Sequence, residues 1–256
     1  MEEMEQIDVP CRGQQQSLQK PILSEDGDSL TLQFRIGEIQ SEMSKSDPNF
    51  LMLSYTRTMM SFILFHQDPK RIAIIGLGGG SIPKWCFHQL PATDITVSEI
   101  NPLVISLRDE FSIPPDNDRF RVLCQDGADY VAYTKDSPDV ILVDGFDADG
   151  QSPQLCSQKF YNDCFRALAP DGLLVVNLCD PRDPQFLERM RKSFDDRVLI
   201  VVPRIDGENK VAFALKGSNV WIKDEPKEEF AKRLLAILRK PASEGVQPPS
   251  HQLVNG

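Results

Sequence analysis

Short apolar runs alternate along this chain with longer stretches in which hydrophobic residues recur at helical spacing. The apolar runs are rich in isoleucine, valine and leucine, as buried strands are, and occupy residues 72–75, 95–97, 120–124, 139–143 and 173–176. The stretches that follow them are amphipathic and occupy residues 83–89, 102–111, 128–134, 158–168 and 184–194. This order of strands and helices predicts an α/β fold built on a parallel sheet.

Two further apolar runs, 198–202 and 210–215, lie on either side of Asp206-Gly207-Glu208-Asn209, a sequence typical of a hairpin turn. They bring the predicted strands to seven and give the sheet an antiparallel end. The pattern therefore predicts a seven-stranded Rossmann-like sheet of the nucleoside-binding kind. A last amphipathic stretch, 227–239, predicts a helix.

The N-terminal part of the chain follows a different pattern. Residues 1–20 show no periodicity and predict a flexible arm. Within 21–46, residues 30–35 alternate apolar with polar and residues 39–43 can pair back, which predicts a short β-hairpin appendage. A helix from Asp47 through Phe62 then opens the α/β domain, which we expect to span residues 47–240. Residues 241–256 predict a disordered tail.

The composition narrows the class of protein. With 41% hydrophobic residues among 256, the chain can form a large core. A net charge of −10 without a basic stripe argues against a nucleic-acid partner, and no apolar run approaches the roughly 20 residues of a membrane span. The acidic start lacks the features of a signal peptide. Six cysteines without a CxxC pair, of which Cys86, Cys124 and Cys179 lie among core residues, predict reduced thiols and a cytoplasmic protein.

A glycine-rich loop, residues 76–80, directly follows the first strand of the predicted sheet. Ser81 stands where a helix N-cap is expected, and a proline two residues later fits the first helical turn. A strand, a glycine loop and a helix in this order bring backbone N–H groups against a nucleotide-like ligand. We therefore expect Gly76, Gly78 and Gly80 to bind a nucleoside; a purely structural turn is the alternative.

Acidic residues follow the next three strands at their carboxyl ends. Glu99 lies about twenty residues after the glycine loop, where a carboxylate can bind ribose hydroxyls. Asp126-Gly127 follows the third strand, and Asp144 and Asp147 follow the fourth. Because ligands of open α/β sheets bind at the carboxyl ends of the strands, these acids predict one common site. Asp144 comes straight after four apolar residues, where burial is costly without a partner.

Taken together, these residues resemble the spermidine synthase (polyamine aminopropyltransferase) family, which has the methyltransferase-type sheet of S-adenosylmethionine-dependent enzymes. The resemblance covers roughly residues 30 to 215 and rests on the order and spacing of several short matches. The matching residues are Gly37-Glu38-Ile39-Gln40, Asp47, Ser54-Tyr55, the loop 76–80, Glu99, Asp126-Gly127, Asp144, Asp147 and Phe160-Tyr161.

The resemblance implies a transferase of polyamine biosynthesis that moves an aminopropyl group from a decarboxylated S-adenosylmethionine to a small-molecule amine, without a metal. It also implies that the acceptor is bound by Tyr55 and Asp147. The residues implied to bind the nucleoside are Gln40, Gly76, Gly78, Gly80, Glu99, Asp126 and Gly127. An alkylammonium, with a pKa near ~10, must lose a proton before it can attack. Asp144 is the expected base. We expect a homodimer, with no nucleic-acid or membrane partner.

The chain departs from the family at several positions and is a divergent member. Gly79 stands where the family's glycine loop has an aspartate for the aminopropyl amine, and Arg57 stands in place of a diamine-binding glutamate. Asp147 is not followed by the family's proline, and no aromatic residue lies near Ile205. If Gly79 and Arg57 face the ligands, diamine binding is weakened. Two alternatives therefore stay open: transfer from intact S-adenosylmethionine to another acceptor, and a non-catalytic nucleoside-binding relative.

Overall fold

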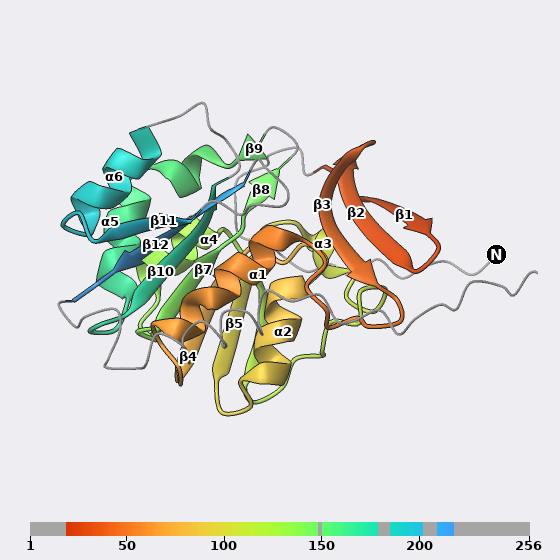
Figure 1. The fold of residues 1–256 in the computed structure, drawn as a ribbon, viewed down its shortest axis with the longest axis horizontal. Helices are drawn as coiled ribbons and strands as arrows, with labels where there is room; N and C mark the ends of the chain where they lie inside the picture. Colours follow the sequence, from red (N-terminus) through yellow and green to blue (C-terminus); the bar gives the residue numbers. More distant parts are fainter. Residues whose placement is uncertain (1–18, 148–149, 179–184, 202–208, 218–256) are drawn as a thin grey trace, which may run out of the picture.

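A large sheet, two small sheets and their helices make up the described part of the protein (Figure 1). Its computed structural model describes residues 19–147, 150–178, 185–201 and 209–217. The small antiparallel sheet has the order β1 (Ile22–Asp26), β2 (Ser29–Arg35), β3 (Glu38–Ser44). The large sheet has the order β11 (Val198–Val201), β12 (Lys210–Leu215), β10 (Leu173–Leu178), β7 (Val140–Val143), β4 (Arg71–Ile75), β5 (Asp94–Glu99), β6 (Phe120–Cys124). A third, two-stranded sheet joins β8 (Phe146–Asp147) to β9 (Gly150–Gln151).

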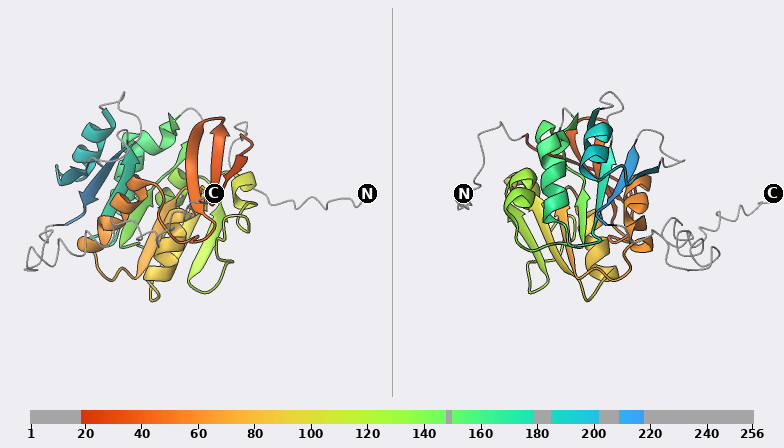
Figure 2. Two further views of the ribbon diagram at one scale, coloured as in Figure 1. Left: turned by 45° about the vertical axis from the view of Figure 1, so that its right-hand side comes forward. Right: turned by 90° about the vertical axis from the view of Figure 1, so that its left-hand side faces the viewer.

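Helices cover both faces of the large sheet, as the right-hand view of Figure 2 shows. They are α1 (Ser54–Met60), α2 (Ser81–Gln89), α3 (Pro102–Ile105), α4 (Gly127–Tyr133), α5 (Gln158–Ala167) and α6 (Gln185–Ser193), with the 3₁₀ helices η1 (Ser61–Leu64) and η2 (Pro153–Cys156). None of the helices within the described ranges is long and apolar enough to cross a membrane.

The predicted α/β class and the seven-stranded sheet with its antiparallel end are confirmed, because β12 pairs antiparallel with both β10 and β11. The N-terminal appendage contains the expected hairpin of β2 and β3, and β1 adds a third strand to it. The predicted tail, the helix at 227–239 and nearly all of the predicted arm lie outside the described residues.

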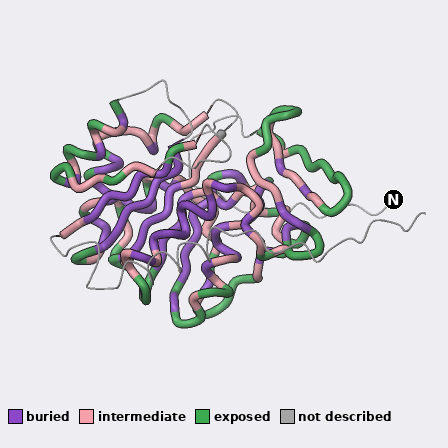
Figure 3. The backbone as a smooth tube through the Cα atoms, viewed as in Figure 1, coloured by how far each residue is buried: buried purple, intermediate pink, exposed green. Residues whose placement is uncertain are grey.

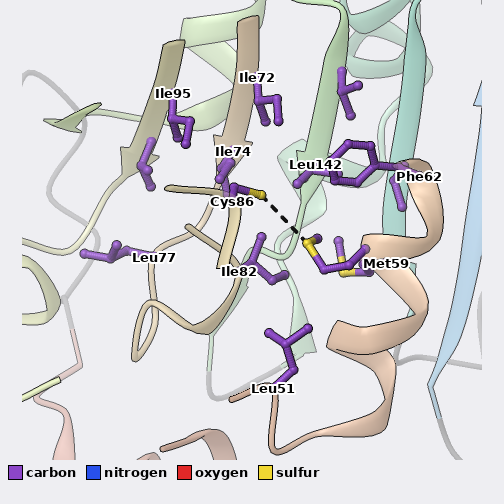
Figure 4. Close-up of a cluster of buried hydrophobic side chains, with 14 of the residues drawn as sticks. Leu51, Met59, Phe62, Ile72, Ile74, Leu77, Ile82, Cys86, Ile95 and Leu142 are labelled. Atoms are coloured by element: carbon purple, nitrogen blue, oxygen red, sulfur yellow. Dashed lines mark hydrogen bonds between the residues drawn. The ribbon is translucent and has the colours of Figure 1, made fainter. Parts of the chain in front are cut away.

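Alternate residues of the central strands supply two separate cores. Ile72 and Ile74 pack with Met59, Phe62 and Cys86 on the face that α1, η1 and α2 cover (Figure 4). The neighbouring residues of the same strands face α4, α5 and α6. Figure 3 shows that burial is continuous along the centre of the large sheet and much lower on the small one. The sheet therefore forms a rigid base whose strand ends can carry a site.

Two helix boundaries differ from the sequence-based prediction. The helix expected from residue 47 begins only at Ser54, because Nη1 of Arg57 donates to the carbonyl oxygens of Leu51 and Met52 and holds that stretch outside the helix. The helix expected at 102–111 ends at Ile105 and continues as a series of turns.

The cysteine prediction is partly wrong. Cys86 and Cys164 are buried free thiols whose pKa values are raised by burial, as expected of core cysteines. Cys124, however, is only half-buried and is disulfide-bonded, and its partner lies outside the described residues. The predicted state of Cys179 also lies outside them. A cytoplasmic location therefore loses the support that Cys124 was expected to give.

The ends of β4 and β7 approach each other closely at Gly76. The N–H of Asp144 donates to the carbonyl oxygen of Ile75 at 2.8 Å, and the N–H of Gly76 donates to that of Ser98 at 2.8 Å. A Cβ atom on Gly76 would lie 2.3 Å from the carbonyl oxygen of Asp144, so only glycine fits. Strand order reverses beside β4, which is where open α/β sheets bind ligands.

We expect Gly76→Ala to lower the melting temperature more than Gly37→Ala does. Both glycines have positive φ, +96° and +90°, where a Cβ atom costs roughly 1–2 kcal/mol. Only at Gly76 does the Cβ atom also collide with backbone; at Gly37 nothing lies within 4 Å. Calorimetric melting of both variants checks this, and equal losses would show that the close approach at Gly76 relaxes at no cost.

Candidate active site

The glycine loop turns from β4 into α2 through three residues in left-handed backbone. Gly76, Gly78 and Gly80 have φ values of +96°, +51° and +69°. Gly80 is the residue directly before α2, so the loop runs into the N-terminus of a nine-residue helix. The sequence predicted Ser81 as the N-cap of this helix. In the structure Gly80 is the N-cap, and Ser81 is the first helical residue. The dipole of the helix makes its N-terminus attractive to electron-rich ligand atoms.

Glu99 joins the end of β5 to the glycine loop. Its Oε2 accepts the N–H of Leu77 at 2.8 Å, and its Oε1 accepts the N–H of Asn101 at 2.8 Å. Burial raises the pKa of Glu99, and the N–H donors of Asn101 and Leu77 oppose that rise. A carboxylate can accept about four hydrogen bonds, so capacity remains for ribose hydroxyls. The structure brings Glu99 to the loop, as predicted, and gives it the additional role of fixing the loop.

The small sheet reaches the glycine loop through Ser41. Its Oγ accepts the N–H of Gly79 at 2.9 Å. A Cβ atom on Gly79 would lie 2.9 Å from the ring of Phe111 and 3.0 Å from Cβ of Ser41. The space into which an aspartate at position 79 would extend is therefore filled. Gln40 lies next to Ser41, half-buried at an irregularity in the pairing of β3 with β2, and its contact with a nucleoside stays a prediction.

Lys84 holds Phe111 against the loop. Its Nζ donates to the carbonyl oxygen of Phe111 at 2.7 Å and lies 3.1 Å from Sδ of Met43. The side chain is fully buried, and burial lowers the pKa of Lys84 to about 8. An amine donates hydrogen bonds in either protonation state. Lys84 therefore ties β3, α2 and the segment after α3 together around the glycine loop.

Asp126 and Gly127 have structural roles at the start of α4. Oδ1 of Asp126 caps this helix by accepting the N–H of Ala128 at 2.7 Å. A Cβ atom on Gly127 would lie 2.1 Å from Cγ2 of Ile75, so this glycine permits close packing of α4 on β4. Both residues lie at the predicted edge of the sheet. Their contact with the adenine side of a nucleoside stays a prediction.

Asp144 accepts hydrogen bonds from two side chains, one at each carboxylate oxygen. Tyr55 Oη donates to its Oδ2 at 3.1 Å, and Asn177 Nδ2 donates to its Oδ1 at 2.8 Å. Burial raises the pKa of Asp144, while the hydrogen bonds from Asn177 and Tyr55 oppose the rise. Two residues predicted for the site, 89 positions apart, are thus in direct contact. A carboxylate with a raised pKa is suited to take a proton from a bound ligand.

Two asparagines belong to this cluster and were missed by the sequence reasoning. Asn177 is 1% exposed at the carboxyl end of β10, and its Oδ1 accepts from Nδ2 of Asn209 at 3.1 Å. The rule that found the acids, a polar residue at the carboxyl end of a strand, also applies to Asn177. No comparable signal marks Asn209, which directly precedes β12.

The remaining predicted residues lie in different surroundings. Asp147 is part of β8, but its side chain lies outside the description. Arg57 is buried, and its Nη1 is committed to backbone carbonyls before α1, so the expectation that it faces the acceptor is not supported. Phe160 and Tyr161 are buried and pack edge to face within the core.

A cavity of about 540 Å³ is lined by Gln151, Pro153, Cys156, Ser157, Gln158, Phe186 and Arg189, none of them a residue predicted for the site. One of its lining residues reaches the acid cluster: Nε2 of Gln151 donates to the backbone carbonyl of Asn177 at 3.4 Å. In the part of the chain that the structure describes, no group of three or more His, Cys, Asp or Glu residues is placed to hold a metal ion.

Known proteins with similar sequences and folds share this arrangement of elements. The family model described as spermine/spermidine synthase domain matches residues 52–201. The polyamine aminopropyltransferase of Chromobacterium violaceum is 41% identical over 199 residues, which cover 77% of this chain and 76% of that protein.

Two solved structures show the same fold at 23% sequence identity. A probable spermidine synthase from Corynebacterium glutamicum has a TM-score of 0.68 and covers 84% of this chain and 83% of its own. A spermidine synthase in complex with the transition-state analogue AdoDATO has a TM-score of 0.64, with coverage of 88% and 86%.

We expect Glu99→Ala to weaken methylthioadenosine binding and to destabilise the protein at the same time. A lost hydrogen bond to a charged group costs ~1.5–3 kcal/mol in binding, and the N–H of Leu77, left without its acceptor, adds ~1–3 kcal/mol of lost stability. Calorimetric titration and thermal melting measure the two effects. Unchanged affinity in a folded variant would remove Glu99 from the nucleoside site.

We expect Asp144→Asn to gain stability relative to the parent protein as the pH rises. The pKa of Asp144 is raised above its ordinary value of 3.8, so folding favours its protonated form. The protonated side chain of Asp144 contributes its full stability at pH values below the ordinary pKa of 3.8. This contribution is lost as the pH rises through the pKa of the folded state. Asparagine lacks this dependence. Urea unfolding from acidic to neutral pH checks it, and a difference that stays constant with pH would contradict it.

Proposed function

The chain belongs to the spermine/spermidine synthase family, and on this basis we propose which of its residues bind the donor and which act on the acceptor. The protein is an aminopropyltransferase, which moves an aminopropyl group from decarboxylated S-adenosylmethionine to an amine. The family and the activity expected from the sequence are thereby confirmed. The observation that supports the proposal for the site is the contact of the half-buried Asp144 with Tyr55 and Asn177.

Asp144 is the base in this proposal. The acceptor arrives as an ammonium ion and gives a proton to the carboxylate, which leaves a free electron pair on nitrogen. That pair attacks the aminopropyl carbon next to the sulfonium, the carbon–sulfur bond breaks, and its electrons stay on sulfur. The products are an aminopropylated amine and methylthioadenosine. Tyr55 Oη, 3.1 Å from Asp144, is placed to contact the same nitrogen, and Asp147 follows three residues later to hold the acceptor's far end.

The donor nucleoside occupies the other half of the site. Gly76, Gly78 and Gly80 offer backbone at the N-terminus of α2, and Glu99 binds the ribose hydroxyls. Asp126, Gly127 and Gln40 complete the pocket around the base and the ribose. The support for this assignment is positional: the loop, Glu99 and Asp126 end three neighbouring strands, β4, β5 and β6.

Transfer from intact S-adenosylmethionine is the second candidate, and Gly79 is the observation that favours it. The carboxylate that the family uses for the aminopropyl amine is missing, and the ring of Phe111 and the side chain of Ser41 fill its place. Without a negative charge at this end of the pocket, the site does not select the decarboxylated donor, whose tail carries an amine alone, over the intact donor, whose tail also carries a carboxyl group. The donor's tail is therefore the part of the substrate that this site specifies least.

The proposal also covers the acceptor, the oligomeric state and the location of the protein. The acceptor is a diamine or polyamine, since the half-buried carboxylate of Asp144 favours a cationic ligand. A homodimer is supported by exposed apolar side chains on the small sheet, among them Ile22, Leu23 and Ile36. The net charge of −10 supports the absence of a nucleic-acid partner, and the cytoplasmic location stays a prediction.

We expect the purified protein to release methylthioadenosine when it is given decarboxylated S-adenosylmethionine and a diamine. Turnover should rise with pH through an apparent pKa that is absent in Asp144→Asn, because the base must be ionised. That variant should lose ~10²–10⁴-fold in turnover and keep its affinity for methylthioadenosine. Asp116→Asn, which changes an exposed acid paired with Arg108, is the matched control and should keep parental turnover.

Three outcomes separate the alternatives. Near-parental turnover in Asp144→Asn would exclude Asp144 as the base. S-adenosylhomocysteine formed from intact S-adenosylmethionine would favour methyl transfer, the second candidate. Binding of both donors without any turnover would identify the chain as a non-catalytic relative.

A further inference from the structure

Three hydrogen bonds connect Asn209, Asn177, Asp144 and Tyr55 in one chain. Asn209 donates to Asn177 Oδ1 at 3.1 Å, Asn177 donates to Asp144 Oδ1 at 2.8 Å, and Tyr55 donates to Asp144 Oδ2 at 3.1 Å. The sheet sets up this contact: β10 runs parallel to β7 with Val176 paired to Val143, so the next residues, Asn177 and Asp144, are level with each other.

The orientation of the Asn177 amide is fixed by its neighbours. An amide group accepts at its oxygen and donates at its nitrogen. Because the Asn209 amide donates to Oδ1 of Asn177, the NH₂ group of Asn177 faces Asp144. The flipped arrangement would place an amide oxygen against a carboxylate and two NH₂ groups against each other, and both contacts are repulsive. The contacts of Asn177 with Asn209 and with the carboxylate therefore agree on the orientation in which a donor, and not an acceptor, faces Asp144.

We propose that Asn177, oriented by Asn209, is a positioning residue that holds Oδ1 of Asp144 and leaves Oδ2 to receive the acceptor's proton beside Tyr55. This inference rests on the proposed role of Asp144 as the base. Neither asparagine is a proton acceptor in the reaction; both act through the carboxylate. The family resemblance assigned no role to either of them.

Electrostatics gives the two asparagines a measurable effect. Asp144 is half-buried, and the desolvation of its carboxyl group raises its pKa, which favours the protonated form that cannot act as a base. The N–H of Asn177 stabilises the ionised form and opposes that rise. Among the described residues the Tyr55 phenol is the titratable group in direct contact with Asp144, and asparagine does not titrate. Loss of the Asn177 donor therefore leaves a larger share of Asp144 protonated at a given pH.

The experiment compares Asn177→Ala, Asn209→Ala and the control Asn162→Ala. Asn162 is an exposed asparagine of α5 with two hydrogen-bond partners of its own, Gln158 and Ser193. Carbon-13 NMR of aspartate carboxyls gives the pKa of Asp144, whose signal is identified by its absence in Asp144→Asn. We expect the pKa to rise in Asn177→Ala, to rise less in Asn209→Ala, and to stay unchanged in Asn162→Ala.

Turnover should follow the same order. A hydrogen bond to a charged group is worth enough to reduce turnover about tenfold at pH values below the parental pKa, and the rate should recover at higher pH. An unchanged pKa in both Asn177→Ala and Asn209→Ala, or a shifted pKa with an unshifted rate profile, overturns the proposal. If Asn177→Ala does not fold, Asn209→Ala still tests the proposal, because Asn209 is only half-buried and its replacement disturbs the core less. A shifted pKa in a protein without any turnover would instead contradict the proposed function and leave the electrostatic link standing.

Discussion

The close approach of β4 and β7 is the constraint on which the rest of the site depends. The backbone carbonyl of Asp144 occupies the position that a side chain on Gly76 would need. The same contact places the start of the glycine loop and the acid on adjoining strands, at the point where the strand order reverses. In the proposed site, a donor along the loop and an acceptor at Asp144 would meet without any movement of the sheet. Rigid strands on both sides, buried in two cores, keep this geometry.

Two carboxylates lie at this edge, the buried Glu99 and the half-buried Asp144, and they are stabilised in different ways. Glu99 accepts backbone N–H groups, which are fixed by the path of the chain, so its charge is tied to the position of the glycine loop. Asp144 accepts from side chains. The hydroxyl of Tyr55 can donate or accept and so can follow a change in protonation, whereas the amide of Asn177 cannot. This difference suits Glu99 to binding and Asp144 to proton transfer.

Sequence reasoning predicted the fold and the acids because both follow from local rules. Apolar runs defined the strands, and polar residues at their carboxyl ends located Glu99 and Asp144. Hydrogen bonds between residues far apart in the sequence had no such signal. Asn209 and Asn177 are separated by 32 positions, and Gly79 and Ser41 by 38. The sequence left open whether Arg57 faces the acceptor, because a sequence gives the position of a side chain and not its direction. The late start of α1 has the same cause.

The space that an aspartate at position 79 would need is not empty but filled by packed side chains. Phe111 is fully buried against Gly79, Lys84 holds its carbonyl oxygen, and Ser41 bonds the N–H of Gly79 itself. A carboxylate introduced there would collide with a ring that has no free volume to enter. Restoring the family's residue therefore requires changes on β3 and on the segment after α3 as well. In the proposed site, the donor-tail end therefore depends on several packed residues together, Ser41, Phe111 and Lys84, and not on position 79 alone.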